Sequence, residues 1–217
     1  VEDEKMFFGR DELVNEICTH LSEHSGQCFV LYGQKRSGKT SVLRHVGKNL
    51  PKNCFFTEAS ALSFNYDGEK VMPAFVKEIY DPVIERMEEL SIDKQADFPT
   101  YEDAMQDPQR TLRRISKFLA SKGYQWVIAI DEFTAIYADK PEEVAAFMHA
   151  WKSFLEAKLF NALIIGQDTM PRFKNEYPND FCVTHDKRIT FLSKESSFKM
   201  AIEPILLNNE SRYKGNA

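Results

Sequence analysis

The sequence predicts an α/β protein, a three-layer sandwich in which helices cover both faces of a mostly parallel five-stranded sheet. Short apolar runs alternate along the chain with longer segments whose apolar residues recur at helical spacing. Strands that alternate with helices are typical of parallel sheets with right-handed crossovers. The runs predicted to be strands cover residues 28–32, 53–58, 126–132, 162–166 and 189–192.

Helices are predicted before and between these strands. Apolar residues four positions apart predict a helix over 11–24, and the clearest helical pattern covers 141–158, whose aromatic residues we assign to the core. The segment 69–90 also has a helical pattern, but Pro82 should break or kink it. Residues 91–108 are polar and contain several prolines, so we predict an excursion or mobile loop there.

Length and composition favour one main domain. A chain of 217 residues with 43% hydrophobic content can build one sizeable core. We assign residues 1–207 to this core, including the N-terminal helix, and residues 208–217 to a polar tail that leads to a missing C-terminal region. The chain begins at Val1 and not at methionine, so we expect it to be a fragment of a longer polypeptide.

Charge and cysteine content indicate a cytoplasmic protein without a membrane segment. The cysteines are scattered, no C-x-x-C spacing occurs, and no apolar stretch approaches 18 residues. The formal net charge is -5, which does not favour nucleic acid as a partner. A DNA-facing surface formed by Arg110, Arg113 and Arg114 stays open, although a solvated helix face is the preferred interpretation.

The octet Gly33-Gln34-Lys35-Arg36-Ser37-Gly38-Lys39-Thr40 has the pattern G-x-x-x-x-G-K-[ST], which cradles phosphate in nucleotide hydrolases. A predicted strand precedes it and a helical pattern that begins near Ser41 follows it, which is the context that this motif requires. Successive backbone N–H groups of such a loop converge on an anion at the helix N-terminus. We expect Lys39 to reach the β- and γ-phosphates and Thr40 to offer its hydroxyl to Mg²⁺.

Polar side chains at the ends of later strands complete the predicted site. Asp131 and Glu132 end a buried strand, and ligands of open α/β sheets lie at the carboxyl ends of the strands. We expect Asp131 to hold Mg²⁺ and Glu132 to take the proton of the attacking water. Gln167 follows the next predicted strand, and it either senses the γ-phosphate or positions water, or it only forms a turn. Arg188 either stabilises charge or is solvated.

Three segments together resemble the STAND class of ATPases, in particular its archaeal-type and prokaryotic branches, which are relatives of the AAA+ ATPases. They are Phe8-Gly9-Arg10-Asp11-Glu12-Leu13, the octet with Ser41-Val42-Leu43, and Ile128-Ala129-Ile130-Asp131-Glu132-Phe133. The resemblance implies a P-loop core of the additional-strand type, in which the strand at 162–166 lies between the P-loop strand and the Asp-Glu strand. It further implies that Phe8, Gly9 and Arg10 lie on the adenine side and that Pro204 approaches the base.

The sequence therefore predicts a module that binds ATP or ADP with Mg²⁺ and hydrolyses ATP slowly. We expect it to act as a STAND-like switch in a larger signalling or defence protein, with protein partners or self-assembly through missing regions. Two alternatives stay open. One is a nucleotide-binding scaffold that never turns over, and the other is a DNA-transaction ATPase of the initiator or transposition-helper type.

Overall fold

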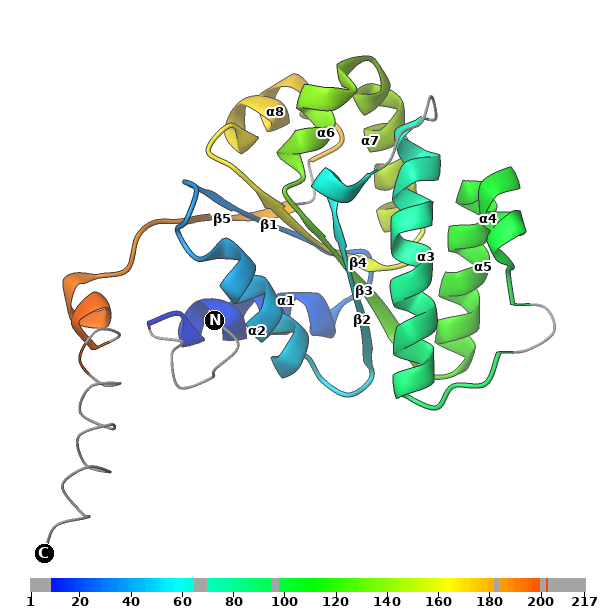
Figure 1. The fold of residues 1–217 in the computed structure, drawn as a ribbon, viewed down its shortest axis with the longest axis horizontal. Coiled ribbons are helices and arrows are strands. Elements are labelled where there is room, and N and C mark those ends of the chain that lie inside the picture. The colour runs from blue at the N-terminus through cyan, green and yellow to red at the C-terminus, as the bar shows by residue number, and fades with distance from the viewer. Residues whose placement is uncertain (1–8, 65–69, 95–97, 182–183, 200–201, 203–217) are drawn as a thin grey trace, which may run out of the picture.

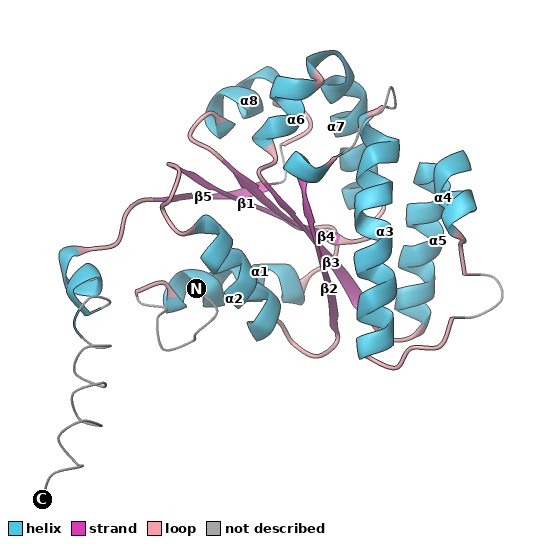
Figure 2. Cartoon of the chain, viewed as in Figure 1, coloured by secondary structure: helices cyan, strands magenta, loops and turns pink. Residues whose placement is uncertain are grey.

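The structure is a computed structural model that describes residues 9–64, 70–94, 98–181, 184–199 and 202. A twisted sheet of five parallel strands lies between two helical layers (Figures 1 and 2). The strands are β1 (Cys28–Gly33), β2 (Cys54–Ser60), β3 (Gln125–Asp131), β4 (Asn161–Gly166) and β5 (Thr184–Ile189). The helices are α1 (Asp11–Glu23), α2 (Lys39–Asn49), the 3-10 turn η2 (Ala61–Ser63), α3 (Val71–Glu89), α4 (Tyr101–Gln106), α5 (Pro108–Ser121), α6 (Thr134–Asp139), α7 (Pro141–Glu156) and α8 (Met170–Glu176).

The sheet order is β2-β3-β4-β1-β5, and every pairing in it is parallel. This confirms the predicted α/β class. It also confirms that a further strand, β4, lies between the P-loop strand β1 and the strand β3 that ends in Asp131. Because all strands run the same way, their carboxyl ends meet at one edge of the sheet, as ligand sites of α/β folds require.

The two faces of the sheet are buried by different helices. In β1 the side chains of Phe29 and Leu31 belong to the apolar cluster formed with α1 and α2, whereas Cys28 and Val30 belong to the cluster on the other face. This alternation follows from the two-residue period of a strand. The second cluster is the larger and contains the aromatic residues of α7, whose assignment to the core is confirmed.

Pro82 was predicted to break or kink this segment, and a break is wrong, because helix α3 continues from Val71 to Glu89 with Pro82 inside it. A proline inside a helix costs about 3 kcal/mol. Ile79, Val83 and Met87 lie on both sides of it and are completely buried, and each such side chain stabilises the fold by about 1.5–3 kcal/mol. Tertiary packing therefore outweighs the local penalty.

The polar segment 91–108 is more ordered than predicted. It contains the short helix α4, which begins at a capping box in which Thr100 and Asp103 satisfy each other's backbone N–H groups. Asp107 then caps α5 through the N–H of Arg110. The prediction of a loop failed here because the helix start depends on local capping by polar side chains and not on an apolar period.

The last strand also differs from its prediction. The run 189–192 was expected to be a strand, but β5 covers Thr184–Ile189 and ends where that run begins. Its polar residues suit an edge strand, and among the described residues it pairs with β1 alone. Lys187 donates to Glu16 on α1 at 2.8 Å, and Lys174 on α8 forms an ion pair with Asp186. The predicted domain boundary near residue 207 lies outside the described residues.

A completely buried amide ties α1 to the sheet. The side-chain nitrogen of Asn161 donates to the carbonyl oxygens of Leu21 at 2.6 Å and His24 at 2.7 Å, and its oxygen accepts from the N–H of Gln27 at 2.8 Å. Three backbone groups at the end of α1 therefore depend on one side chain.

No helix in the described part of the chain is long and apolar enough to cross a membrane.

We predict that Asn161→Ala lowers the free energy of unfolding by about 3 kcal/mol, because it leaves buried backbone groups without partners. Urea denaturation followed by circular dichroism measures this loss. The control is Asn15→Ala at an exposed position of α1, which should change stability by less than about 0.5 kcal/mol. A loss below about 1 kcal/mol for Asn161→Ala would show that water replaces the amide.

Candidate functional site

The predicted phosphate loop lies between the end of β1 at Gly33 and the start of α2 at Lys39. Gly38 has φ 90°, in the left-handed region, and a Cβ built on it would meet nothing within 4 Å. Gly33 is needed for another reason, because a Cβ there would lie 2.2 Å from the carbonyl oxygen of Ile189 in β5. One glycine therefore shapes the loop, whereas the other admits the neighbouring strand.

The ammonium group of Lys39 lies over this loop. It donates to the carbonyl oxygens of Gly33 at 3.0 Å and Gln34 at 2.8 Å, and the side chain is only 6% exposed. The hydroxyl of Ser37 also donates to Gln34, at 2.9 Å. The side chains of Gln34, Lys35 and Arg36 are exposed, so in this loop the backbone and Lys39 are the groups placed to bind phosphate.

Thr40 and Asp131 meet at the carboxyl edge of the sheet. The hydroxyl of Thr40 donates to one carboxylate oxygen of Asp131 at 2.8 Å, and the other oxygen accepts from the N–H of Glu132 at 2.8 Å. A hydroxyl and a carboxylate are hard oxygen donors, and Mg²⁺ is usually held by one or two carboxylates together with substrate phosphates. These residues therefore fit the predicted ion.

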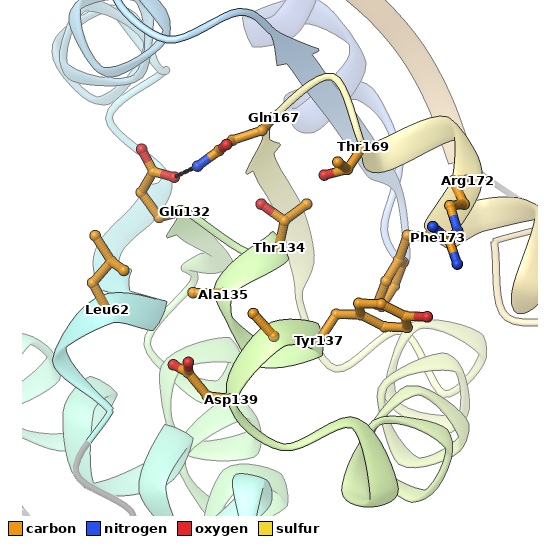
Figure 3. Close-up of a pocket in the computed structure, with 11 residues that line it drawn as sticks. Leu62, Glu132, Thr134, Ala135, Tyr137, Asp139, Gln167, Thr169, Arg172 and Phe173 are labelled. Carbon is orange, nitrogen blue, oxygen red and sulfur yellow. Dashed lines mark hydrogen bonds between the residues drawn. The ribbon is translucent and has the colours of Figure 1, made fainter.

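Glu132 adopts a left-handed conformation with φ 50°, which is uncommon for a residue other than glycine and costs energy. The turn separates its side chain from that of Asp131. The carboxylate of Glu132 accepts a hydrogen bond from the amide of Gln167 at 3.0 Å, so residues from the ends of β3 and β4 meet (Figure 3). The structure thus brings together the predicted water activator and the predicted sensor. The backbone carbonyl oxygen of Gln167 also accepts a hydrogen bond from the N–H of Met170 at 2.9 Å, which closes the turn before α8.

The remaining predicted residues lie at the edges of this arrangement. Arg188 donates to Asp168 at 3.2 Å and is more than half exposed, which matches a solvated ion pair. Gly9 lies against Ser196, and the guanidinium of Arg10 donates to the carbonyl oxygen of Thr190, so this segment contacts the chain that follows β5. Phe8 and Pro204 lie outside the described residues, and the adenine-side assignment stays a prediction.

Sequence reasoning missed Glu58 on β2. Alternation along β2 places it on the same face as Phe56, toward α2, and Asp131 on the adjoining β3 points to this face too. Partial burial raises the pKa of Glu58, the charge of Asp131 raises it further, and Arg44 on α2 lowers it. The two-residue period of the strand was the signal that could have located this second carboxylate near the site.

A cavity of about 400 Å³, which we call the α6–α8 cavity, adjoins the Glu132–Gln167 pair. Figure 3 shows its walls, which come from η2, from α6, from the segment that joins β4 to α8, and from α8 itself. Leu62, Ala135 and Phe173 make it largely apolar, and Glu132 and Asp139 contribute carboxylates. Sequence reasoning did not predict this cavity, because its walls are brought together by chain segments that are far apart in sequence.

Other predicted features outside the site are structural. Cys18, Cys28 and Cys54 are free and buried, and burial raises the pKa of Cys28 to about 12. In the described ranges no group of three or more histidine, cysteine or acidic side chains is placed to hold a metal ion. On the face considered for DNA, Arg114 pairs with Asp103 at 3.0 Å and Arg113 lies over the ring of Phe154, so both are engaged within the domain.

The fold and the loop geometry define a P-loop nucleotide-binding domain. Residues 6–163 match the AAA ATPase domain family, and the chain therefore belongs to this family. Members of this class bind ATP and in general hydrolyse nucleoside triphosphates. No curated protein matches the chain in sequence.

Similar solved structures include a Walker-type ATPase and ORC and Cdc6 proteins. The Walker-type ATPase of Pyrococcus abyssi has a TM-score of 0.70 and 15% identity, covering 94% of this chain and 59% of its own. The ORC2 protein of Aeropyrum pernix, solved in ADPNP–ADP complexes, has a TM-score of 0.62 and 11% identity, covering 93% and 55%. Cdc6p of Pyrobaculum aerophilum has a TM-score of 0.56 and 13% identity, covering 94% and 53%. At these identities the likeness shows the fold, and this chain spans little more than half of each protein.

We predict that Gly38→Ala weakens ATP binding by at least about tenfold, because an alanine resists the left-handed conformation that aims the loop N–H groups. Isothermal titration calorimetry with ATP and Mg²⁺ measures the change. Gly123→Ala is the matched control, since Gly123 also has a positive φ, of 83°, with nothing near its would-be Cβ.

Both substitutions should cost about 1–2 kcal/mol of stability, whereas only Gly38→Ala should weaken ATP binding. Equal ATP affinities for the two variants would contradict a role of Gly38 in shaping the binding loop.

Proposed function

We propose that this chain is an Mg-ATP-dependent ATPase module that acts as a conformational switch within a larger protein. One observation carries the proposal: the Thr40–Asp131 contact and the Glu132–Gln167 contact lie at the same edge of the sheet as the loop that carries Lys39. Nucleotide hydrolysis needs phosphate binding, a metal anchor and a group that orients water, and these residues supply one of each.

The chemistry follows from the placement of these side chains. The loop amides and Lys39 bind the β- and γ-phosphates, and Thr40 with Asp131 holds Mg²⁺, which when bound neutralises charge on the phosphates. Glu132 accepts the proton of the attacking water. Gln167 holds the Glu132 carboxylate in one orientation, so it acts on water through Glu132 and not as a proton acceptor itself.

The switch role rests on the way in which such domains use nucleotide. In such domains the γ-phosphate orders loops, and the loops lose this order when the phosphate is hydrolysed. The change alters which surfaces the domain presents to other parts of the protein. The STAND-like pattern of Phe8-Gly9-Arg10, the phosphate loop and Asp131-Glu132 supports a signalling or defence protein as the larger context. The Gly9–Arg10 segment contacts residues after β5. Nucleotide bound on the proposed adenine side would therefore act through this contact on the C-terminal part of the chain.

Two alternatives make different predictions for the same preparation. A scaffold that never turns over would bind ATP but show no single-turnover hydrolysis. A DNA-transaction ATPase would bind duplex DNA with a steep salt dependence. The likeness to ORC2 and Cdc6p supports their fold for this chain, and the net charge of -5 gives no support to a DNA-binding surface.

We predict that Lys39→Ala abolishes measurable ATP binding, because it removes the buried ammonium above the phosphate loop. Titration calorimetry and a filter-binding assay with labelled ATP measure the loss. Lys35→Ala is the control, since this lysine lies in the same loop with an exposed side chain. If Lys35→Ala were as harmful as Lys39→Ala, the effect would come from net loop charge and not from the position of one ammonium group.

Glu132→Gln should retain ATP binding while slowing hydrolysis by about a hundredfold or more, because an amide cannot accept the proton of water. Single-turnover hydrolysis of labelled ATP under excess enzyme measures the rate. Glu142→Gln in the first turn of α7 removes a charge outside the site and should leave the rate unchanged. Hydrolysis by Glu132→Gln at the parental rate would remove Glu132 from the mechanism.

A further inference from the structure

The α6–α8 cavity lies beside the site, not within the phosphate loop. The residues of the octet and Asp131 do not line the cavity. Of the proposed catalytic groups, Glu132 and Gln167 line it. In Figure 3 the Glu132–Gln167 hydrogen bond spans one end of the cavity, and Tyr137, Phe173 and Arg172 lie at the other. A ligand in this space would therefore lie next to the group proposed to activate water.

The charges around the cavity favour a cation. The carboxylate of Asp139, at the end of α6, is exposed and forms no hydrogen bond or ion pair with any residue that the structure describes. Glu132 presents a second carboxylate. Among the described residues that line the cavity, the positive charge is that of Arg172, which is 78% exposed and paired with Glu176 at 3.1 Å. The cavity thus has two carboxylates and a guanidinium that is already paired.

The walls favour a flat or aromatic cation. The ring of Tyr137 stands edge-on to Phe173, with ring centroids 5.5 Å apart, and makes one aromatic wall. Aromatic rings attract cations through their quadrupole, and this adds to attraction by carboxylates. Thr134 and Thr169 contribute hydroxyl groups that can accept from an N–H donor.

The dimensions favour a small molecule over a protein partner. A volume of about 400 Å³ lies in the range of small-molecule sites, which are concave and mostly apolar with a few polar groups. Of the large apolar side chains exposed in the described residues, Leu62 lines the cavity, whereas Tyr101, Phe191 and Phe198 do not. The cavity therefore has no extended apolar surround of the kind that a protein interface needs.

We propose that the α6–α8 cavity binds a small organic cation of the amidine, guanidine or amine class, held by Asp139, Glu132 and the Tyr137 ring. Bound there, the cation would compete with the amide of Gln167 for the Glu132 carboxylate. The binding site stands on the cavity alone, whereas the effect on turnover rests on the proposed function.

The binding test compares benzamidine with benzamide, which have nearly the same shape but differ in charge. We expect titration of the parental protein, followed by NMR or calorimetry, to show benzamidine binding about tenfold tighter than benzamide. Asp139→Asn should remove most of this preference, and Glu142→Gln, which removes a charge outside the cavity, should keep it. Tyr137→Leu should weaken benzamidine more than benzamide. Equal binding of the two compounds, or a preference that survives Asp139→Asn, would overturn the proposal.

A second measurement separates this proposal from the proposed function. Benzamidine should slow single-turnover ATP hydrolysis by the parental protein, benzamide should not, and Asp139→Asn should need a higher benzamidine concentration for the same effect. If the parental protein hydrolyses no ATP but binds benzamidine through Asp139, the proposed function fails and the cation site stands. If it hydrolyses ATP at the same rate with the cavity saturated, the competition for Glu132 is wrong.

Discussion

The hydrogen bond between Thr40 and Asp131 is the contact on which the geometry of the site depends. These residues follow β1 and end β3, which are separated by β4, so they meet only because a parallel sheet brings its carboxyl ends to one edge. Asp131 is mostly buried there, and its second oxygen binds the N–H of Glu132. One carboxylate thereby joins the phosphate loop to the turn that carries the proposed water activator.

The left-handed backbone conformation of Glu132 is energetically unfavourable by itself, but it orients the side chains around the turn. A left-handed residue other than glycine persists only where its surroundings hold it, and here the Asp131 carboxylate and the Gln167 amide hold it from two sides. The conformation separates two adjacent carboxylates, so Asp131 faces the α2 layer and Glu132 faces β4 and the α6–α8 cavity. The separation of the two adjacent carboxylates is thus a property of the backbone.

Much of the fold and most of the phosphate loop could be predicted from the sequence, because the spacing of apolar residues differs between strands and helices and can be seen directly in the sequence. The failures have local causes. Pro82 is tolerated because Ile79, Val83 and Met87 are buried around it. The last strand was predicted too late in the sequence, because β5 is an edge strand and need not be apolar. Glu58 and the α6–α8 cavity were missed because no motif places a β2 side chain beside Asp131 or brings η2 to α8.

The sequence by itself determined the class of sheet, the phosphate loop and the carboxylates after the third apolar run, because each is a pattern within a few consecutive residues. Only the tertiary structure decided that Gln167 bonds Glu132, that Gly33 makes room for Ile189, and that a cavity opens beside the pair. These relations join residues tens or more than a hundred positions apart. Their distances are set by strand order and helix packing, which no local pattern encodes.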